Sequence, residues 1–147
     1  SVLYNGPQQY GPANLLYLEK TGYKSTMVCF PYDDLDSWRA HYPREVLYDQ
    51  FQKVANKWKE GLETLAEMLD VVEESKSDVA KADYDLAKVC YLHYASVANQ
   101  IRFILTRDAM LENDGPDNEE DVLIELLIQE EQLAKELHSI AIRDSRV

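Results

Sequence analysis

Cys90 and His93 lie three residues apart, a spacing that places both side chains on one face of a helix. A cysteine beside a histidine can act as a nucleophile, with the thiolate attacking and the imidazole serving as the base. A thiol in the middle of a helix, however, lacks the helix N-terminus that lowers a cysteine pKa, and the surrounding stripe is apolar. We therefore interpret this pair as core packing, and a free-standing enzyme that uses it is the least favoured interpretation.

A second set of chemically useful residues lies between 30 and 39, where aromatic side chains are mixed with carboxylates and an arginine. Sugar sites combine ring faces, which stack on C–H faces, with charged groups that hydrogen-bond hydroxyls. If the chain binds carbohydrate, we expect the contacts to come from Tyr32, Asp33, Asp34, Trp38 and Arg39. A retaining glycosidase needs two carboxylates roughly 5 Å apart, whereas side chains of adjacent residues usually diverge. Asp33 and Asp34 are equally explained as helix-capping residues, so no catalytic residue is assigned.

A third set interrupts the apolar stripes of the helical region. Asn99, Gln100, Arg102 and Glu130 fall at positions where burial is expected, and Arg107 and Asp108 extend the polar patch of the second helix. Buried polar groups need hydrogen-bond partners. We expect a buried polar network that ties the helices to residues 1–43, with Glu130 either at its rim or paired with Arg102. The alternative is that some of these side chains reach a ligand or a neighbouring domain.

The chain carries no recognisable metal motif. Carboxylate-rich helical bundles bind two iron or manganese ions through Glu-x-x-His sequences. The residues three positions before the histidines are Trp38, Cys90 and Lys135, so this motif is absent. We expect neither a metal site nor a cofactor.

Three predicted helices carry or adjoin these candidate residues and determine where their side chains lie. Apolar residues recur every three or four positions, which predicts helices at about 44–73, 78–111 and 118–145. Turn-forming residues separate them, and Pro43 suits the start of the first. Short connections between long helices predict an antiparallel three-helix bundle in a mainly α fold.

Residues 1–43 differ from the rest of the chain. They hold four of the five prolines, three of the five glycines and eight of the fifteen aromatic residues. The two Gly-Pro pairs predict turns or extended backbone at Asn5–Pro7 and Tyr10–Pro12. Two short β-strands are predicted at Leu15–Leu18 and Thr26–Phe30, and one short helix at Asp33–His41. So much aromatic surface is atypical of a disordered tail, and we expect the segment to pack on the bundle or on a neighbouring domain.

The length and net charge of the chain limit its domain number and its possible partners. The 147 residues suit one domain, and the net charge of −12 disfavours nucleic acid and anionic membrane surfaces as partners. Two cysteines are too few for a disulfide framework, and no apolar run reaches the roughly 18 residues of a membrane span. The first residue is Ser and the last helix lacks a stop signal, so we expect a processed product or fragment of a longer chain.

Five blocks of the sequence stand out: Gly-Pro-Ala-Asn-Leu-Leu-Tyr (11–17), Thr-Gly-Tyr-Lys-Ser-Thr-Met-Val (21–28), Phe-Pro-Tyr-Asp-Asp-Leu-Asp-Ser-Trp-Arg (30–39), Ala-Asn-Gln-Ile-Arg-Phe (98–103) and Asp-Ser-Arg-Val (144–147). Together they resemble the C-terminal helical region of large bacterial proteins described as glycoside-hydrolase-like. The resemblance implies a helical region that follows a catalytic domain, with the catalytic carboxylates outside these residues. It implies a bacterial protein, either cytoplasmic or exported.

The resemblance and the residue patterns together favour a non-catalytic accessory domain that supports or caps a hydrolase domain and is inactive alone. Its expected partner is the catalytic domain of the same parent chain, and the further candidates are a carbohydrate and a second copy of itself. The alternative, from a different class, is a protein-interaction or oligomerisation module that uses exposed aromatic residues and helix faces.

Overall fold

The computed structural model describes the chain except for residues 1, 13, 23–32, 113–117, 145 and 147. The described part is mainly helical, as the sequence predicts, and a single 3-10 turn (Glu74–Lys76) precedes the longest helix. The α-helices are α1 (Val2–Gln9), α2 (Leu35–Trp38), α3 (Arg44–Leu69), α4 (Ser77–Glu112) and α5 (Glu119–Ala141).

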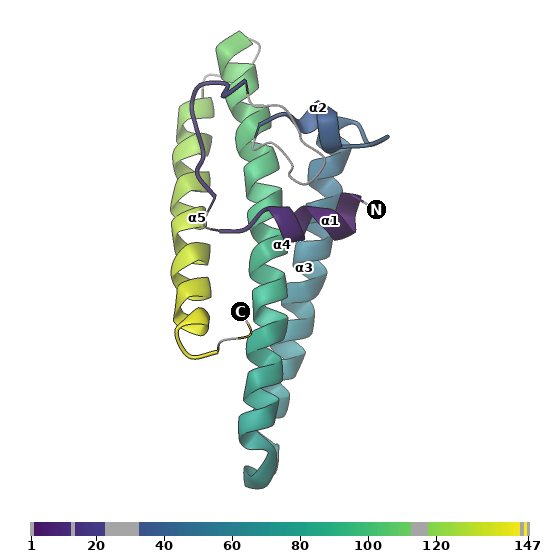
Figure 1. Cartoon of the computed structure of the whole chain (residues 1–147), viewed down its shortest axis with the longest axis vertical. Helices are drawn as coiled ribbons and strands as arrows, with labels where there is room; N and C mark the ends of the chain where they lie inside the picture. The colour runs from purple at the N-terminus through teal and green to yellow at the C-terminus, as the bar shows by residue number, and fades with distance from the viewer. Residues whose placement is uncertain (1, 13, 23–32, 113–117, 145, 147) are drawn as a thin grey trace.

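Helix α4 is the centre of a helical, bundle-like arrangement (Figure 1). It packs extensively against both α3 and α5, which run antiparallel to it, whereas α3 and α5 have at most sparse contact with each other. Helix α1 crosses α4 near the middle of its length (Figure 1). In the described part of the chain, α1, α3 and α5 all pack on α4, which explains why α4 is apolar on more than one face.

The prediction of short β-strands in residues 1–43 is wrong. The described residues contain no strand: 14–17 have no regular structure, and Thr26–Phe30 lies outside the described part. A strand needs a neighbouring strand for its backbone hydrogen bonds. Here a side chain supplies bonds instead, since Arg107 Nη1 donates to the carbonyl oxygens of Tyr17 (3.3 Å) and Glu19 (3.5 Å).

The expected turn at Asn5–Pro7 is part of helix α1. A β-carbon at Gly6 would lie 2.6 Å from Phe51 Cζ, so only glycine lets this helix lie so close to α3. At the end of α1, His93 Nδ1 lies 3.0 Å from the carbonyl oxygen of Pro7 and 3.1 Å from that of Tyr10. Packing on α3 and contact with α4 thus stabilise a helix that its own Gly-Pro sequence disfavours.

Helix α2 is shorter than the helix expected at Asp33–His41. Ala40 has a φ of 56°, in the left-handed region, which ends the helical run soon after its first turn. The carbonyl of Asp34 accepts hydrogen bonds from the backbone nitrogen (3.2 Å) and hydroxyl (3.0 Å) of Ser37. The single turn is sufficient to direct Leu35 and Trp38 inward.

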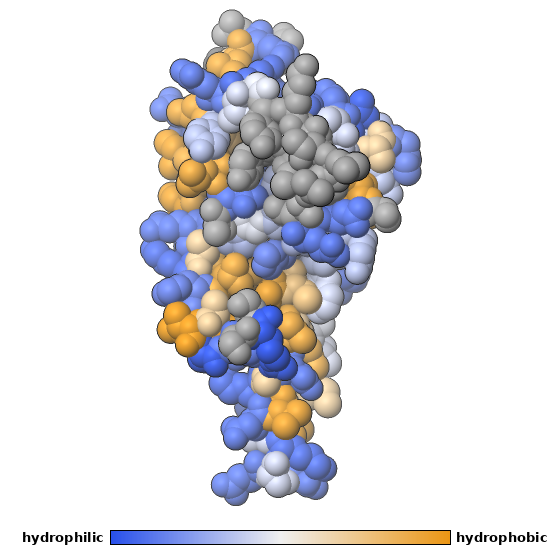
Figure 2. All heavy atoms as spheres, in the orientation of Figure 1, coloured by the Kyte–Doolittle hydropathy of each residue, from blue (hydrophilic) through white to orange (hydrophobic). Residues whose placement is uncertain are grey.

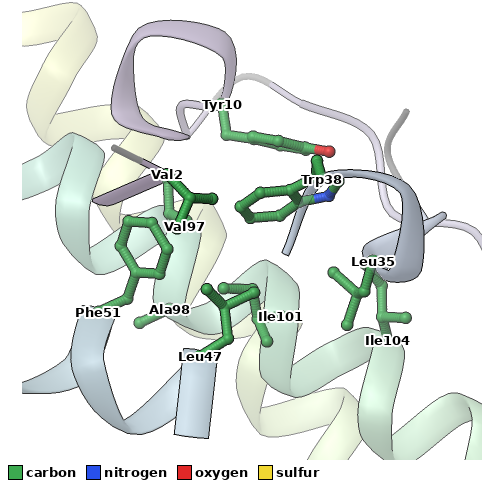
Figure 3. Close-up of a cluster of buried hydrophobic side chains, with 10 residues drawn as sticks. All are labelled: Val2, Tyr10, Leu35, Trp38, Leu47, Phe51, Val97, Ala98, Ile101 and Ile104. Atoms are coloured by element: carbon green, nitrogen blue, oxygen red, sulfur yellow. The ribbon is translucent and has the colours of Figure 1, made fainter. Parts of the chain in front are cut away.

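The main core lies where residues 2–10 and 35–42 cover α3 and α4 (Figure 3). The Trp38 ring lies between Tyr10, at a centroid distance of 5.3 Å, and Phe51, at 6.3 Å. The remaining buried members of this core come from α1, α2, α3 and α4 and are Val2, Leu35, Leu47, Val97, Ala98, Ile101 and Ile104. Two smaller clusters join α4 to α5, around Leu92 and around Phe103.

Within the described ranges, no helix combines the length and the hydropathy that crossing a membrane requires.

Candidate functional site

The most deeply buried charge belongs to Arg107 of α4, whose side chain is 1% exposed. Its Nη1 donates to Asp33 Oδ2 at 3.1 Å, and its Nη2 donates to Asp108 Oδ1 at 2.8 Å. The guanidinium also bonds the two backbone carbonyls of residues 17 and 19. Buried charges are tolerated when they are paired and their donors are satisfied, and Arg107 meets both conditions.

Further ion pairs extend from Asp108 toward the surface. Arg44 at the start of α3 donates to Asp108 Oδ2 at 3.2 Å and also pairs closely with Asp36. Asp36 in turn accepts from Arg39 Nε at 2.6 Å. We call this set of side chains, from Asp33 through Arg107, Asp108, Arg44 and Asp36 to Arg39, the arginine cluster. It joins α2, the start of α3 and the end of α4 at one end of the molecule.

The arginine cluster favours the ionised forms of Asp33 and Asp36. Burial alone would raise the pKa of Asp33, but hydrogen bonds from the hydroxyl and backbone nitrogen of Thr21 (both 2.6 Å) and from Arg107, with the charge of Arg107, lower it overall. Hydrogen bonds from Arg44 and Arg39 lower the pKa of Asp36 to about 2. A carboxylate with a lowered pKa is a poor general acid or base near neutral pH, so the cluster is suited to structural pairing.

The structure distributes the proposed sugar-contact residues among internal contacts. Trp38 is 6% exposed and packs in the core, where it offers no ring face to a ligand. Asp33 is bound by Thr21 and Arg107, and Arg39 donates to Asp36 and to the carbonyl oxygen of Tyr42 (2.7 Å). Asp34 is half-buried beside α2, and Tyr32 lies outside the described residues. The described members do not form a shared site, because Asp33 and Trp38 face inward to different partners.

A second polar cluster lies between α4 and α5 and is centred on Glu130. Its carboxylate accepts from Ser96 Oγ at 2.7 Å and from Asn99 Nδ2 at 3.0 Å. Gln100 Nε2 donates to Ser96 Oγ (2.7 Å) and to the carbonyl oxygen of Gly11 (3.1 Å), so the network reaches the N-terminal segment. We call Ser96, Asn99, Gln100 and Glu130 the glutamate cluster.

Glu130 is buried, and within the described part of the chain its carboxylate pairs with no cationic side chain, in contrast to the carboxylates of the arginine cluster. Burial raises the pKa of Glu130 to about 7, although the hydrogen bonds from Ser96 and Asn99 act in the opposite direction. The carboxyl therefore titrates near neutral pH. It occupies the place of an apolar residue in the stripe that α5 presents to α4, between Leu126 and Leu133.

The structure thus brings together Asn99, Gln100 and Glu130, three of the four residues expected in the polar network. Arg102 lies elsewhere: it is exposed, and its guanidinium carbon lies 5.7 Å from the centre of the Tyr48 ring. Arg102 lies two positions beyond Gln100 on α4, about 200° around the helix, so the two side chains point to opposite sides. Ser96 was missed because a serine in an apolar stripe gives no signal of its own.

Arg107 and Asp108 were expected to join the polar network that binds residues 1–43, but the pairing of Arg107 with Asp33 was not. Asp33 was expected as a cap or a sugar contact, whereas its partner lies 74 residues further along the chain. A second long-range pair joins Asp85 of α4 to Arg143 after α5, with Nη2–Oδ1 at 3.0 Å. No local spacing connects either pair, since each depends on how segments far apart in sequence dock.

Cys90 and His93 both line a small groove of about 270 Å³ between α1 and α4. Burial raises the pKa of the Cys90 thiol, and a backbone hydrogen bond offsets only part of this effect. Contact of His93 Nδ1 with two carbonyl oxygens assigns the proton to that nitrogen. A thiol with a raised pKa is a weak nucleophile at neutral pH, and His93 serves here to hold the end of α1.

In the described part of the chain, no group of three or more His, Cys, Asp or Glu side chains is arranged to hold a metal ion.

The fold and the two clusters define a helical, bundle-like domain whose buried charged and polar side chains bind one another. Comparisons with models of protein families, with curated protein sequences and with solved structures found no match.

Proposed function

We propose that this chain is a non-catalytic helical accessory domain of a bacterial glycoside-hydrolase-like protein, where it supports or caps the catalytic domain. The observation that carries the non-catalytic part is the internal pairing of Asp33, Arg107 and Asp108, which occupies charged groups that could otherwise act on a substrate. The hydrolase as parent rests on the resemblance of the five sequence blocks. Nothing in the geometry requires a sugar, so carbohydrate contact is the weaker part of the proposal.

The clusters explain how such a domain would work as a rigid support. The arginine cluster holds residues 17–21 and Asp33 to α4, and the glutamate cluster holds Gly11 and Asn14 through Gln100. The N-terminal segment is therefore fixed to α4 at two separate places. A neighbouring domain that packs on this segment would have its orientation fixed relative to the helices.

The test compares the 147-residue chain with a full-length bacterial protein in which equivalent residues are joined to a hydrolase domain. The isolated chain is expected to hydrolyse none of a panel of aryl glycosides and oligosaccharides. Deletion of the equivalent residues is expected to lower the melting temperature of the remaining hydrolase domain. Hydrolysis by the isolated chain that Asp33→Asn abolishes would contradict the proposal, and so would a deletion that changes neither melting nor activity.

The second candidate is a protein-interaction or oligomerisation module. It is favoured by apolar side chains that remain exposed on α3 and α5, among them Leu65, Met68, Ile124, Leu127 and Ile128. Figure 2 shows hydrophobic surface along the flank formed by α5 and the N-terminal residues beside it. Sedimentation of the isolated chain tests this function: an oligomerisation module is expected to self-associate without a hydrolase domain, and a chain that stays monomeric would contradict it.

A further inference from the structure

Helix α3 carries a shallow apolar groove with a volume of about 750 Å³. All of its described lining residues belong to α3, and Val54, Trp58 and Leu65 form its apolar floor. The charged residues that line it are Lys53 and Lys57; Lys57 also pairs with Glu60 beside the groove, at 2.6 Å. A basic, apolar groove is unusual on a chain with a net charge of −12. We call it the α3 groove.

Gly61 lies inside this groove, near the middle of a 26-residue helix. Glycine in a helix interior is destabilising because it loses more backbone freedom than other residues. At Gly6 and Gly11 a β-carbon would collide with a neighbour, but at Gly61 it would meet no atom within 4 Å. Packing within one chain therefore does not account for Gly61, whereas the close approach of another helix would.

Helix α5 presents a complementary surface. Ile124, Leu127 and Ile128 are about half exposed and follow the i, i+3, i+4 spacing of one helix face. Asp121 and Glu125 lie within a turn of this stripe. We call these five residues the α5 stripe. A helix that docks into a groove does so through apolar anchors at this spacing.

We propose that the α3 groove of one copy of this chain binds the α5 stripe of a second copy. Charge selects this pairing: the acidic flank of the α5 stripe meets Lys53 and Lys57, whereas two α3 grooves would oppose lysines and two α5 stripes would oppose carboxylates. In Figure 1, α3 and α5 flank α4 on different sides, so each copy offers one groove and one stripe. The contact is head-to-tail, and it builds a ring or an open chain of copies.

The test uses two double variants that each remove one half of the contact. Lys53→Glu/Leu65→Glu disrupts the groove and leaves the stripe intact, whereas Ile124→Ser/Ile128→Ser disrupts the stripe and leaves the groove intact. Sedimentation velocity is measured over a wide range of concentration, with circular dichroism to establish that each variant is folded. The wild-type chain is expected to associate as concentration rises, and each variant alone is expected to remain monomeric.

An equimolar mixture of the two variants is the decisive sample. One intact groove and one intact stripe remain, so the mixture is expected to form a one-to-one dimer that grows no further. A wild-type chain that stays monomeric at every concentration overturns the proposal. A mixture that stays monomeric also overturns it, because a symmetric contact or a contact elsewhere would then explain wild-type association.

Two further variants test whether association depends on the α3 groove or on exposed apolar surface in general. Met68→Ser/Val71→Ser removes exposed apolar groups of α3 and its end that do not line the groove, and association is expected to be unchanged. Gly61→Ala is expected to weaken association by roughly tenfold, since the close approach of the second helix is lost, while the monomer melts at a higher temperature. Loss of association in the first variant, or unchanged association in the second, would overturn the assignment of the groove.

Discussion

The arginine cluster and the glutamate cluster attach the same N-terminal segment to the same helix, but they differ in the partners that surround their buried charged groups. In the arginine cluster, Arg107 is surrounded by carboxylates and carbonyl oxygens, so each charge has an opposite partner. In the glutamate cluster, Glu130 has only neutral donors from Ser96 and Asn99. The first arrangement stabilises the ionised groups, whereas the second makes ionisation of Glu130 costly.

This difference gives the two clusters opposite dependence on pH. The lowered pKa of Asp33 means that its contribution to stability is present above its unfolded pKa of about 3.8 and is lost as the pH falls through the folded value. The raised pKa of Glu130 means that the folded state keeps a proton that the unfolded state releases. Its contribution is therefore present below about pH 4.5 and is lost as the pH rises through about 7.

Substitution of Arg107 should give the largest effect on this comparison. Arg107→Ala leaves Asp33 and Asp108 without their shared partner, and we expect the free energy of unfolding to fall by about 3–5 kcal/mol in urea titrations. Arg107→Lys should recover only part of the loss, because an ammonium group cannot bond both carboxylates and the carbonyls in the same plane. Lys135→Ala, in an exposed pair with Glu131, is the control and should change little. A small loss in Arg107→Ala would show that the arginine cluster contributes little to folding.

Substitution of Glu130 should give the next largest effect, with the opposite sign. Gln keeps an acceptor for Ser96 or Asn99 but cannot ionise. A shift in pKa from 4.5 to about 7 corresponds to an ionisation cost of order 3 kcal/mol, an upper value because the cluster can relax. Above pH 7, we expect Glu130→Gln to unfold at higher urea concentration than the wild type.

The pH profile separates this effect from a general improvement in packing. The advantage of Glu130→Gln should shrink as the pH falls from 7 toward 4.5, because over this range the folded wild type binds a proton at Glu130 that the unfolded chain does not, and this stabilises the wild type. Urea midpoints measured across this range provide the test. An advantage that does not change with pH would contradict the assignment of a buried, uncompensated carboxyl.

Gly6→Ala disturbs the segment that both clusters hold, without touching either cluster. The new β-carbon would lie 2.6 Å from Phe51 Cζ, so α1 must shift away from α3. We expect a loss of about 1–3 kcal/mol in unfolding free energy, typical of overpacking in a core. Increased hydrogen exchange in residues 2–10 should accompany the loss. Unchanged stability and exchange would show that Phe51 moves aside at little cost.

Gly61→Ala is the matched substitution in the later part of α3, which contributes no residue to either cluster, and it should give the smallest effect. Open space surrounds the new methyl group, and alanine is the better helix former, so we expect a gain of about 0.5–1 kcal/mol for the monomer. Thermal melting at low protein concentration measures this gain without contribution from association. A loss of stability would mean that the glycine serves the fold of the single chain.

Local order along the helices follows from the sequence by itself. The spacing of apolar residues predicts a mainly helical, bundle-like fold because helix contacts repeat every three or four residues along the chain. The same periodicity also identifies candidate buried polar residues: Asn99, Gln100 and Glu130 occupy positions where apolar residues are expected. These conclusions need only neighbours within a turn or two.

The tertiary structure determined the features that depend on how the N-terminal segment packs on the long helices. The Gly-Pro pairs of the N-terminal segment suggested turns, but the fit of Gly6 against Phe51 supports a helix there. The composition of residues 1–43 suggested strands, but Arg107 supplies the hydrogen bonds at 17 and 19 that a neighbouring strand would provide. Trp38 and Asp33 looked available to a ligand until the fold buried the one and paired the other. In each case the deciding contact joins residues far apart in sequence, and its energy arises only when the segments pack together.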